Sequence, residues 1–439
     1  MKRPIVIVLL TIALTLVCLG IGAVLFFTLN GGLPTGNPFE VPMVSSQVEE
    51  SKTLKVDPEK PLSLKVTDNA GDVTITGADV DTVQVKVVRT AYATSQAKAD
   101  EEVKTIKYNI EQTGDTITLK YELPNNKTTL SNNINTVDFI VIVPNEIAVD
   151  VNSNLGDVSV ADIKGDVVVE NDFGAVDVEN IEGALSVTNN SGEVTATSIK
   201  AGAEDIELNS DFGAVTLKQA SGNDIKLTSN SGKITLNEVR AIGDVTTKSD
   251  FGDTVFENGS ANSLSIESNS GKVSLLKMKV NGQIKVDDDF GEIELEQAFA
   301  GSYDLHTNSG SITIDGAKGT VKAYTDFGGI KIENAESVTL DIKTNSGTVE
   351  FSGSLGEGPH MVKSEFGQID LTLALDSKLN VDIKTDFGKI KSDLPVSIIL
   401  SGESNSAGEG DHVVGTTNGG GSQLTVQTNS GNININAGK

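Results

Sequence analysis

The chain has 439 residues, a formal charge of −27, 44 glycines, no tryptophan and only 4% aromatic residues. This length fits several ordinary domains or one long repeat array, and so few large rings disfavour a globular enzyme with an aromatic-rich core. The acidity argues against a nucleic-acid partner, because binding phosphates requires basic patches. The single cysteine, Cys18, leaves no disulfide framework within the chain.

The first 30 residues predict a short cytoplasmic stub and a membrane anchor. Lys2 and Arg3 precede an uncharged apolar run from Pro4 to Leu29, which at about 1.5 Å per residue is long enough for one transmembrane helix. The basic residues should remain cytoplasmic, so the rest of the chain is exported to the outside of the cell membrane. A cleaved signal peptide is the alternative, although its apolar region is normally about 7–15 residues long. Both interpretations export the bulk of the chain.

Residues 31–50 contain six glycines and prolines, which are typical of a stiff linker. Alternating apolar residues then predict short strands from about residue 51, and the stretch 91–105 predicts one helix because it is rich in Ala, Glu and Lys. We therefore expect residues 51–136 to form a β-rich cap containing one helix. Such a cap would cover the end of a repeat array, since the ends of solenoids need atypical repeats.

From residue 137 to residue 439 a three-residue motif recurs, and its glycines are 18 to 21 residues apart. A fixed period of this size is typical of a solenoid. Motifs with Phe alternate with motifs with Ser, and we expect all of them to form the corners of the turns: Asp172, Phe173, Gly174; Asn190, Ser191, Gly192; Asp211, Phe212, Gly213; Asn230, Ser231, Gly232; Asp250, Phe251, Gly252; Asn269, Ser270, Gly271; Asp289, Phe290, Gly291; Asn308, Ser309, Gly310; Asp326, Phe327, Gly328; Asn345, Ser346, Gly347.

The motif predicts an all-β fold, a parallel β-helix or β-solenoid of about 15 rungs stacked ~4.8 Å apart. Alternate residues of a strand share a face, so Phe173 and Ser191 are expected to point inward on neighbouring rungs and interdigitate. Two positions earlier the same face carries a small polar residue such as Asn171 or Ser210, and these side chains are expected to form a hydrogen-bonded ladder. Glycine would supply a positive φ at the corner.

The outward position alternates between Asp and Asn, which keeps the carboxylates about two rungs, or ~10 Å, apart and limits their repulsion. Near the end the alternation fails, because Phe366 and Phe387 belong to two successive Phe motifs. A long Gly- and Ser-rich insertion at residues 401–421 follows, before the last motif at Asn429, Ser430 and Gly431.

These features resemble the putative-adhesin family of bacterial and archaeal envelope proteins, a β-helical repeat domain of otherwise unknown function. The resemblance covers about residues 51–439. It rests on the recurring Ser/Asn-Gly-Asp/Glu-Val motifs, on the stretch Ala91–Glu102, and on a closing stretch that runs from Ser392 through Gly419-Gly420-Gly421 to Ile433. The family implies an envelope location and an adhesin-like role, and it supplies no catalytic residues.

Other interpretations of the motifs are weaker. Asp-Phe-Gly also occurs in protein kinases, but the accompanying glycine-rich loop, strand lysine and catalytic loop are missing. The histidines His306, His360 and His412 lack the spacing of a zinc site. We expect no cofactor, although Asp287-Asp288-Asp289 and the Asp column could bind calcium weakly. Gly419-Gly420-Gly421 lacks the Lys-Ser/Thr of a phosphate-binding loop.

The favoured function is therefore a non-enzymatic, membrane-anchored, adhesin-like rod with cell-wall or surface glycans or envelope proteins as partners. One alternative is a carbohydrate-active enzyme, a polysaccharide lyase or hydrolase, since parallel β-helices host such enzymes. These enzymes need carboxylates clustered with Lys or Arg on one face. Another alternative is an accessory protein that senses or regulates the state of the envelope, which would require a partner in the membrane.

Overall fold

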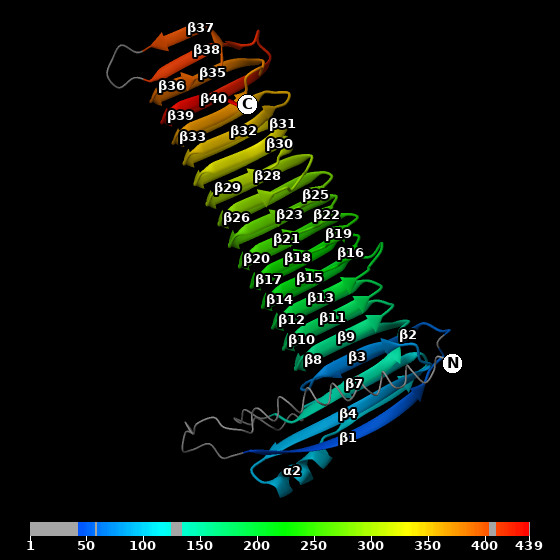
Figure 1. Ribbon diagram of the computed structural model, residues 1–439. Helices are drawn as coiled ribbons and strands as arrows, with labels where there is room; N and C mark the ends of the chain where they lie inside the picture. The colour runs from blue at the N-terminus through cyan, green and yellow to red at the C-terminus, as the bar shows by residue number, and fades with distance from the viewer. Residues whose placement is uncertain (1–42, 58, 124–133, 404–409, 439) are drawn as a thin grey trace.

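The computed structural model describes residues 43–57, 59–123, 134–403 and 410–438. These residues form a long β-solenoid with one short α-helix near its N-terminal end (Figure 1). Each regular turn contributes one strand to a first parallel wall and the next strand to a second parallel wall. The all-β solenoid expected from the repeat is thus confirmed.

The first wall consists of strands that end just before a corner glycine, at Leu155 in the first of them and at the Phe or Ser of the motif in the others. They are β8 (Ile147–Leu155), β10 (Val167–Phe173), β12 (Leu185–Ser191), β14 (Ile206–Phe212), β17 (Ile225–Ser231), β20 (Asp244–Phe251), β23 (Ser263–Ser270), β26 (Gln283–Phe290), β28 (Ser302–Ser309), β30 (Lys318–Phe327), the second half of β31 (Ile330–Ser346), and β33 (His360–Phe366).

The second wall consists of the strands that follow the motif glycine. They are β9 (Val158–Ile163), β11 (Val176–Ile181), β13 (Val194–Ile199), β15 (Val215–Lys218), β18 (Ile234–Asn237), β21 (Thr254–Glu257), β24 (Val273–Leu276), β27 (Ile293–Glu296), β29 (Ile312–Asp315), the first half of β31, β32 (Val349–Leu355) and β34 (Ile369–Ala374). A short third side is formed in the middle turns by β16 (Ser221–Gly222), β19 (Arg240–Ala241), β22 (Ser260–Ala261) and β25 (Lys279–Val280).

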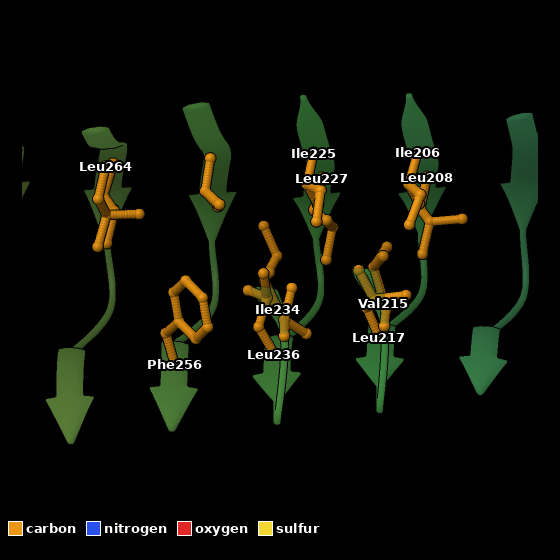
Figure 2. Close-up of a cluster of buried hydrophobic side chains, with 14 of the residues drawn as sticks. Ile206, Leu208, Val215, Leu217, Ile225, Leu227, Ile234, Leu236, Phe256 and Leu264 are labelled. Carbon is orange, nitrogen blue, oxygen red and sulfur yellow. The ribbon is translucent and has the colours of Figure 1, made fainter. Parts of the chain in front are cut away.

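The core lies between the two walls. In each turn alternate aliphatic residues of the two strands point toward each other, as Ile206 and Leu208 do opposite Val215 and Leu217 (Figure 2). All four side chains are fully buried, and the parallel register repeats the same aliphatic layer in the next turn. Thin layers of Val, Ile and Leu therefore replace the large aromatic core of a globular domain.

About 11 turns stack in chain order, and further turns at the C-terminal end stack out of chain order. The expected count of about fifteen included these C-terminal turns. The last turn, β39 (Ser422–Ser430) and β40 (Ile433–Gly438), lies between the β33/β34 turn and the turn formed by β35 (Leu379–Phe387) and β36 (Ile390–Ser392). In space, Ser430 thus separates Phe366 from Phe387, and the Phe/Ser alternation continues.

Antiparallel strands lie at both ends of the solenoid. At the C-terminal end, β37 (Val396–Glu403) and β38 (Asp411–Thr417) form a hairpin in the stretch expected to be a long insertion, and β38 pairs with β35. At the N-terminal end, β2 (Leu62–Asp68) and β3 (Val73–Ala78) pair directly with β8 and β9. Their other sides are covered by β1 (Val44–Lys55), β4 (Thr82–Ala93), β5 (Tyr108–Thr113), β6 (Thr116–Tyr121) and β7 (Thr136–Pro144).

The helix expected at residues 91–105 is shorter in the structure. Strand β4 continues to Ala93, and the helical stretch comprises α2 (Gln96–Glu102) and the 3₁₀ turn η1 (Val103–Thr105). Ala91 and Ala93 at the end of β4 are both buried, so packing of β4 against the core outweighs the helical preference of its last residues. Strand β1 likewise begins at Val44, inside the stretch expected to be a linker.

The predicted stub and membrane span at residues 1–30, and linker residues 31–42, lie outside the described residues. Within the part of the chain that is described, no helix is long and apolar enough to cross a membrane. The anchor therefore remains a prediction from the sequence.

Candidate binding surface

Seven phenylalanines form a row of exposed rings along one edge of the first wall, and we call it the Phe row. Their side chains are between 55% and 68% exposed, and they are Phe173, Phe212, Phe251, Phe290, Phe327, Phe366 and Phe387. Each has a serine of a neighbouring turn beside it as its Cα partner, for example Ser231 beside Phe212 and Ser270 beside Phe290. The expectation that these rings point inward is wrong.

The local geometry of the corner explains the difference. Asn171 pairs with Asn189 and Phe173 with Ser191, but Asp172 between them has no partner in the ladder. The strict alternation of strand faces therefore ends at Asn171, which is buried, and the chain turns outward at Asp172 and Phe173. A prediction based on period two fails wherever a strand bends before its last residue.

The small polar residues do point inward, but they do not bond to one another. Ser210 donates to the carbonyl oxygen of Gly192 at 3.1 Å, and Thr325 donates to that of Gly310 at 3.0 Å. The same bond to a corner glycine of the preceding turn recurs at Asn189, Ser229, Thr307, Thr344, Ser364 and Thr428. These side chains thus satisfy a buried carbonyl at each corner.

The corner glycines are required mainly by close stacking. A Cβ added to Gly213 would lie 1.9 Å from the carbonyl oxygen of Gly192, and one on Gly192 would lie 1.9 Å from that of Gly174. The expected positive φ occurs at Gly174 and Gly192, at 131° and 144°. The corner thus has no room for a side chain between turns.

A column of alternating Asp and Asn runs beside the Phe row. In five turns the side-chain amide of the motif Asn donates to Oδ1 of the Asp in the preceding turn, at 2.7 Å between Asn190 and Asp172 and at 2.7 Å between Asn308 and Asp289. Because a carboxylate has two oxygens and about four lone-pair sites, this bond leaves acceptor capacity that faces solvent. The column therefore lines the Phe row with hydrogen-bond acceptors.

A shallow hollow of about 230 Å³ lies beside this column in the middle of the rod. It is lined by Lys248, Ser249, Asp250, Glu267, Ser268, Asn269, Asp287 and Asp289. Carboxylates and one lysine thus share a face on β20, β23 and β26. The sequence analysis did not predict this cluster, because its members are about 20 residues apart and meet only through the parallel register.

Two aromatic side chains continue the surface next to the hollow. The His306 ring stacks on Tyr324 with 5.1 Å between the ring centroids, and Lys343 Nζ lies 5.4 Å from the centroid of Tyr324. His306 Nδ1 is also 2.8 Å from Asp287 Oδ1. The register of β26, β28 and β30 places these outward residues on consecutive turns.

Asp288 is an exception among the small polar residues that point inward at the corners of the turns. Its side chain is fully buried, and neither carboxylate oxygen accepts a hydrogen bond of ordinary geometry, although the nearby Ser268 hydroxyl and the backbone N–H groups of Asp289 and Phe290 partly favour the ionised form. Burial therefore raises its pKa from 3.8 to about 6. Because Asp287 and Asp289 point outward, the three consecutive aspartates do not converge on one point.

The three histidines lie far from one another in the fold. His360 is buried at the start of β33, where burial lowers its pKa, and His412 Nε2 lies 2.8 Å from Asp382 Oδ1. Within the described ranges, no group of three or more His, Cys, Asp or Glu side chains is placed to hold a metal ion. Gly419, Gly420 and Gly421 lie in the turn between β38 and β39.

The fold and this surface define a capped β-solenoid with a repetitive outer edge. The chain matches the family Toastrack DUF4097 over residues 60–316 and 257–436. It therefore belongs to that family, which confirms the resemblance to a β-helical family of unknown function. None of the curated proteins matches the chain.

Three solved structures show weak similarity. A putative cell adhesion protein from Clostridium sporogenes has 10% identity and a TM-score of 0.21, covering 90% of this chain and 100% of its own. A putative adhesin from Parabacteroides distasonis has 16% identity and a TM-score of 0.37, covering 56% and 97%. A putative adhesin from Bacteroides fragilis has 14% identity and a TM-score of 0.28, covering 65% and 97%. At these scores none supports a conclusion about this chain.

Proposed function

We propose that the protein is an exported, membrane-anchored and non-catalytic adhesin-like rod that uses the Phe row to contact a partner in the cell envelope. The observation that carries the proposal is the exposure of seven phenylalanines along one edge. A protein gains nothing in stability from a large apolar side chain left in water, and a row of exposed apolar side chains on one edge is typical of an interaction surface.

Charge limits the class of partner. The chain carries a formal charge of −27, and the Asp column lies next to the Phe row. Nucleic acids and anionic lipid surfaces would be repelled. Glycans and proteins of the envelope remain the partners that the surface suits.

The membrane anchor is part of the proposal and rests on the sequence. The apolar run from Pro4 to Leu29 has the length of one membrane-spanning helix. Basic Lys2 and Arg3 orient it so that the solenoid lies outside the cell. A cysteine-labelling experiment with a membrane-impermeant reagent on intact cells checks this orientation, using an Asn432→Cys variant. Lack of labelling in intact cells but labelling after lysis would contradict export.

The proposal is tested by binding of the detergent-solubilised full chain to isolated cell-wall fractions, because its anchor would bind membranes whatever the Phe row does. We expect the wild-type chain to sediment with the cell wall, and the triple variant Phe212→Ser, Phe251→Ser, Phe290→Ser to sediment much less. Ile242→Ser is the matched control, because Ile242 is 70% exposed but lies outside the Phe row. Wild-type protein that does not bind the cell wall would contradict the adhesin-like role.

A carbohydrate-active enzyme remains the second candidate, because the hollow unites Lys248 with Glu267 and Asp287. Paired carboxylates can act as general acid and base in glycoside hydrolysis. This candidate predicts release of shorter products from an acidic polysaccharide, and loss of that activity in Glu267→Gln and Asp287→Asn. Absence of products with every acidic polysaccharide tried would exclude it.

A further inference from the structure

The Phe row has a regular period that suits one kind of polymer. Neighbouring turns of a parallel β-stack are ~4.8 Å apart, so rings on every second turn recur every ~10 Å. The serines between them leave a gap beside each ring, as Ser231 does between Phe212 and Phe251. The alternation of Phe and Ser holds between neighbouring turns in the structure even where it fails along the chain, because strand β39 places Ser430 between Phe366 and Phe387.

We propose that the Phe row binds a single extended β-1,4-linked glycan chain of glucose-configured sugars lying along the rod. In such a chain successive sugars are flipped by about half a turn, so the same apolar face recurs once per disaccharide, which is slightly longer than two turns of the solenoid. Each ring can therefore cover the apolar face of every second sugar. This inference rests on the proposed adhesin-like function and names its partner.

The flanking column suits the same ligand. Sugar hydroxyls donate to carboxylates and accept from amides, and Asp and Asn alternate along the Phe row, as Asp172 and Asn190 do. A glycan without charged groups suffers no repulsion from these carboxylates. The combination of stacked rings and lateral acceptors thus provides both contact area and orientation.

A second copy of the chain fits this surface less well. Antiparallel rods could interleave their rings, but that arrangement places the two Asp columns on the same side, where like charges repel. Parallel rods related by a two-fold axis separate the columns, but they put each Phe opposite its own counterpart and leave the gaps unfilled. Neither arrangement both interleaves the rings and keeps the two Asp columns apart.

Titration calorimetry on the full chain tests the proposal with cellobiose, cellohexaose, chitohexaose and maltohexaose. The two β-1,4-linked hexasaccharides should bind at least about tenfold more tightly than cellobiose, because they can contact three rings instead of one. Maltohexaose should not bind, because its α-1,4 linkages curve the chain and do not repeat one face. Equal binding of maltohexaose, or absence of binding by both β-linked hexasaccharides, would overturn the proposal.

Variants of three adjacent rings show whether the Phe row is the binding site. Phe212→Ser, Phe251→Ser, Phe290→Ser should weaken cellohexaose binding about tenfold or more, while the corresponding triple change to Tyr should retain it because the rings remain. Ile242→Ser should have no effect. Binding unchanged in the triple Ser variant would refute the assignment, and so would a dimer of the wild-type chain that this variant dissociates in analytical ultracentrifugation.

The glycan inference and the adhesin-like function can be disproved separately. If the chain binds a cell-wall fraction through the Phe row but binds no β-1,4-linked oligosaccharide, the glycan inference is wrong and the adhesin-like function stands. If the wild-type chain binds no cell-wall fraction and no oligosaccharide, both are wrong.

Discussion

At the residue scale, Asp288 places a carboxylate at a corner where the other regular turns carry a hydrogen-bond donor. The inward polar residues of those turns are Ser, Thr or Asn, which can donate to the carbonyl of a corner glycine. Asp288, whose pKa is raised to about 6, has no donor to offer once it is ionised, and neither of its oxygens accepts a hydrogen bond of ordinary geometry. Its burial is therefore a local cost to stability.

The Asp288→Thr variant should be more stable than the wild type at pH 8 by about 1–3 kcal/mol, the usual cost of a buried unsatisfied polar group. The folded-state pKa of Asp288 is raised from 3.8 to about 6, so folding favours its protonated form. The stabilisation from that proton is complete below pH 3.8 and is lost as the pH rises through about 6.

Thermal unfolding of the two proteins between pH 4 and pH 8 checks this prediction. The difference in melting temperature should be small at pH 4 and should grow toward pH 8. Asp68, whose burial raises its pKa to about 8, is present in both proteins and cancels from the comparison. A difference that shrinks as the pH rises would contradict the assigned pKa shift.

The corner glycines give a second test at this scale, with two adjacent residues as a matched pair. A Cβ on Gly328 would lie 1.9 Å from the carbonyl oxygen of Gly310, whereas the nearest atom to a Cβ on Gly329 is 3.3 Å away. We expect Gly328→Ala to destabilise the fold by about 1–3 kcal/mol, as overpacking does, and Gly329→Ala to have a much smaller effect. Equal denaturation midpoints for the two variants would contradict the close stacking of turns.

At the scale of strands and turns, the sequence predicted the parallel solenoid well, but not the direction of the Phe side chains. The period of the motif and the alternation of aliphatic residues were enough to predict parallel stacking and an aliphatic core. The direction of the Phe side chains could not be predicted, because it depends on a bend at Asp172 that leaves no trace in a period-two pattern. The cluster of Lys248, Glu267 and Asp287 depends in the same way on register between turns.

The order of the last turns was also beyond sequence periodicity. The two successive Phe motifs at Phe366 and Phe387 indicated that the Phe/Ser alternation ends there. In the structure the alternation continues, because the last turn of the chain stacks between the turns that carry these two residues. A strand pairs with whichever edge buries its apolar face best, and chain order only biases that choice. The spatial alternation of Phe and Ser is thus the more constant property.

Cysteine cross-linking tests the inserted turn in a Cys18→Ser background. Lys363 of β33 and Gln427 of β39 are Cα partners, so adjacent turns ~4.8 Å apart bring them within the range of a disulfide. The pair Lys363→Cys, Gln427→Cys should form a disulfide under oxidation. The pair Lys363→Cys, Lys384→Cys should not, because β33 and β35 are two turns apart, and efficient oxidation of that pair would contradict the insertion.

At the scale of the whole molecule, the protein is a rod whose length is available for contact. Antiparallel strands cover both walls at the N-terminal end and the first wall at the C-terminal end (Figure 1), which leaves only the short strand β36 at the open end of the second wall. The high negative charge opposes lateral association between rods. The Phe row is then the one long apolar feature that the described surface presents along several turns.

The exposure and the use of the Phe row can be measured together, since the chain contains no tryptophan. A Phe251→Trp variant places a fluorescent indole at a position that is 64% exposed, and Phe256→Trp places one at a position that is 0% exposed. We predict that acrylamide quenches the first indole strongly and the second weakly, and that saturating cellohexaose protects the first. Quenching of the Phe251→Trp indole as weak as that of the Phe256→Trp indole in the free protein would contradict an outward Phe row.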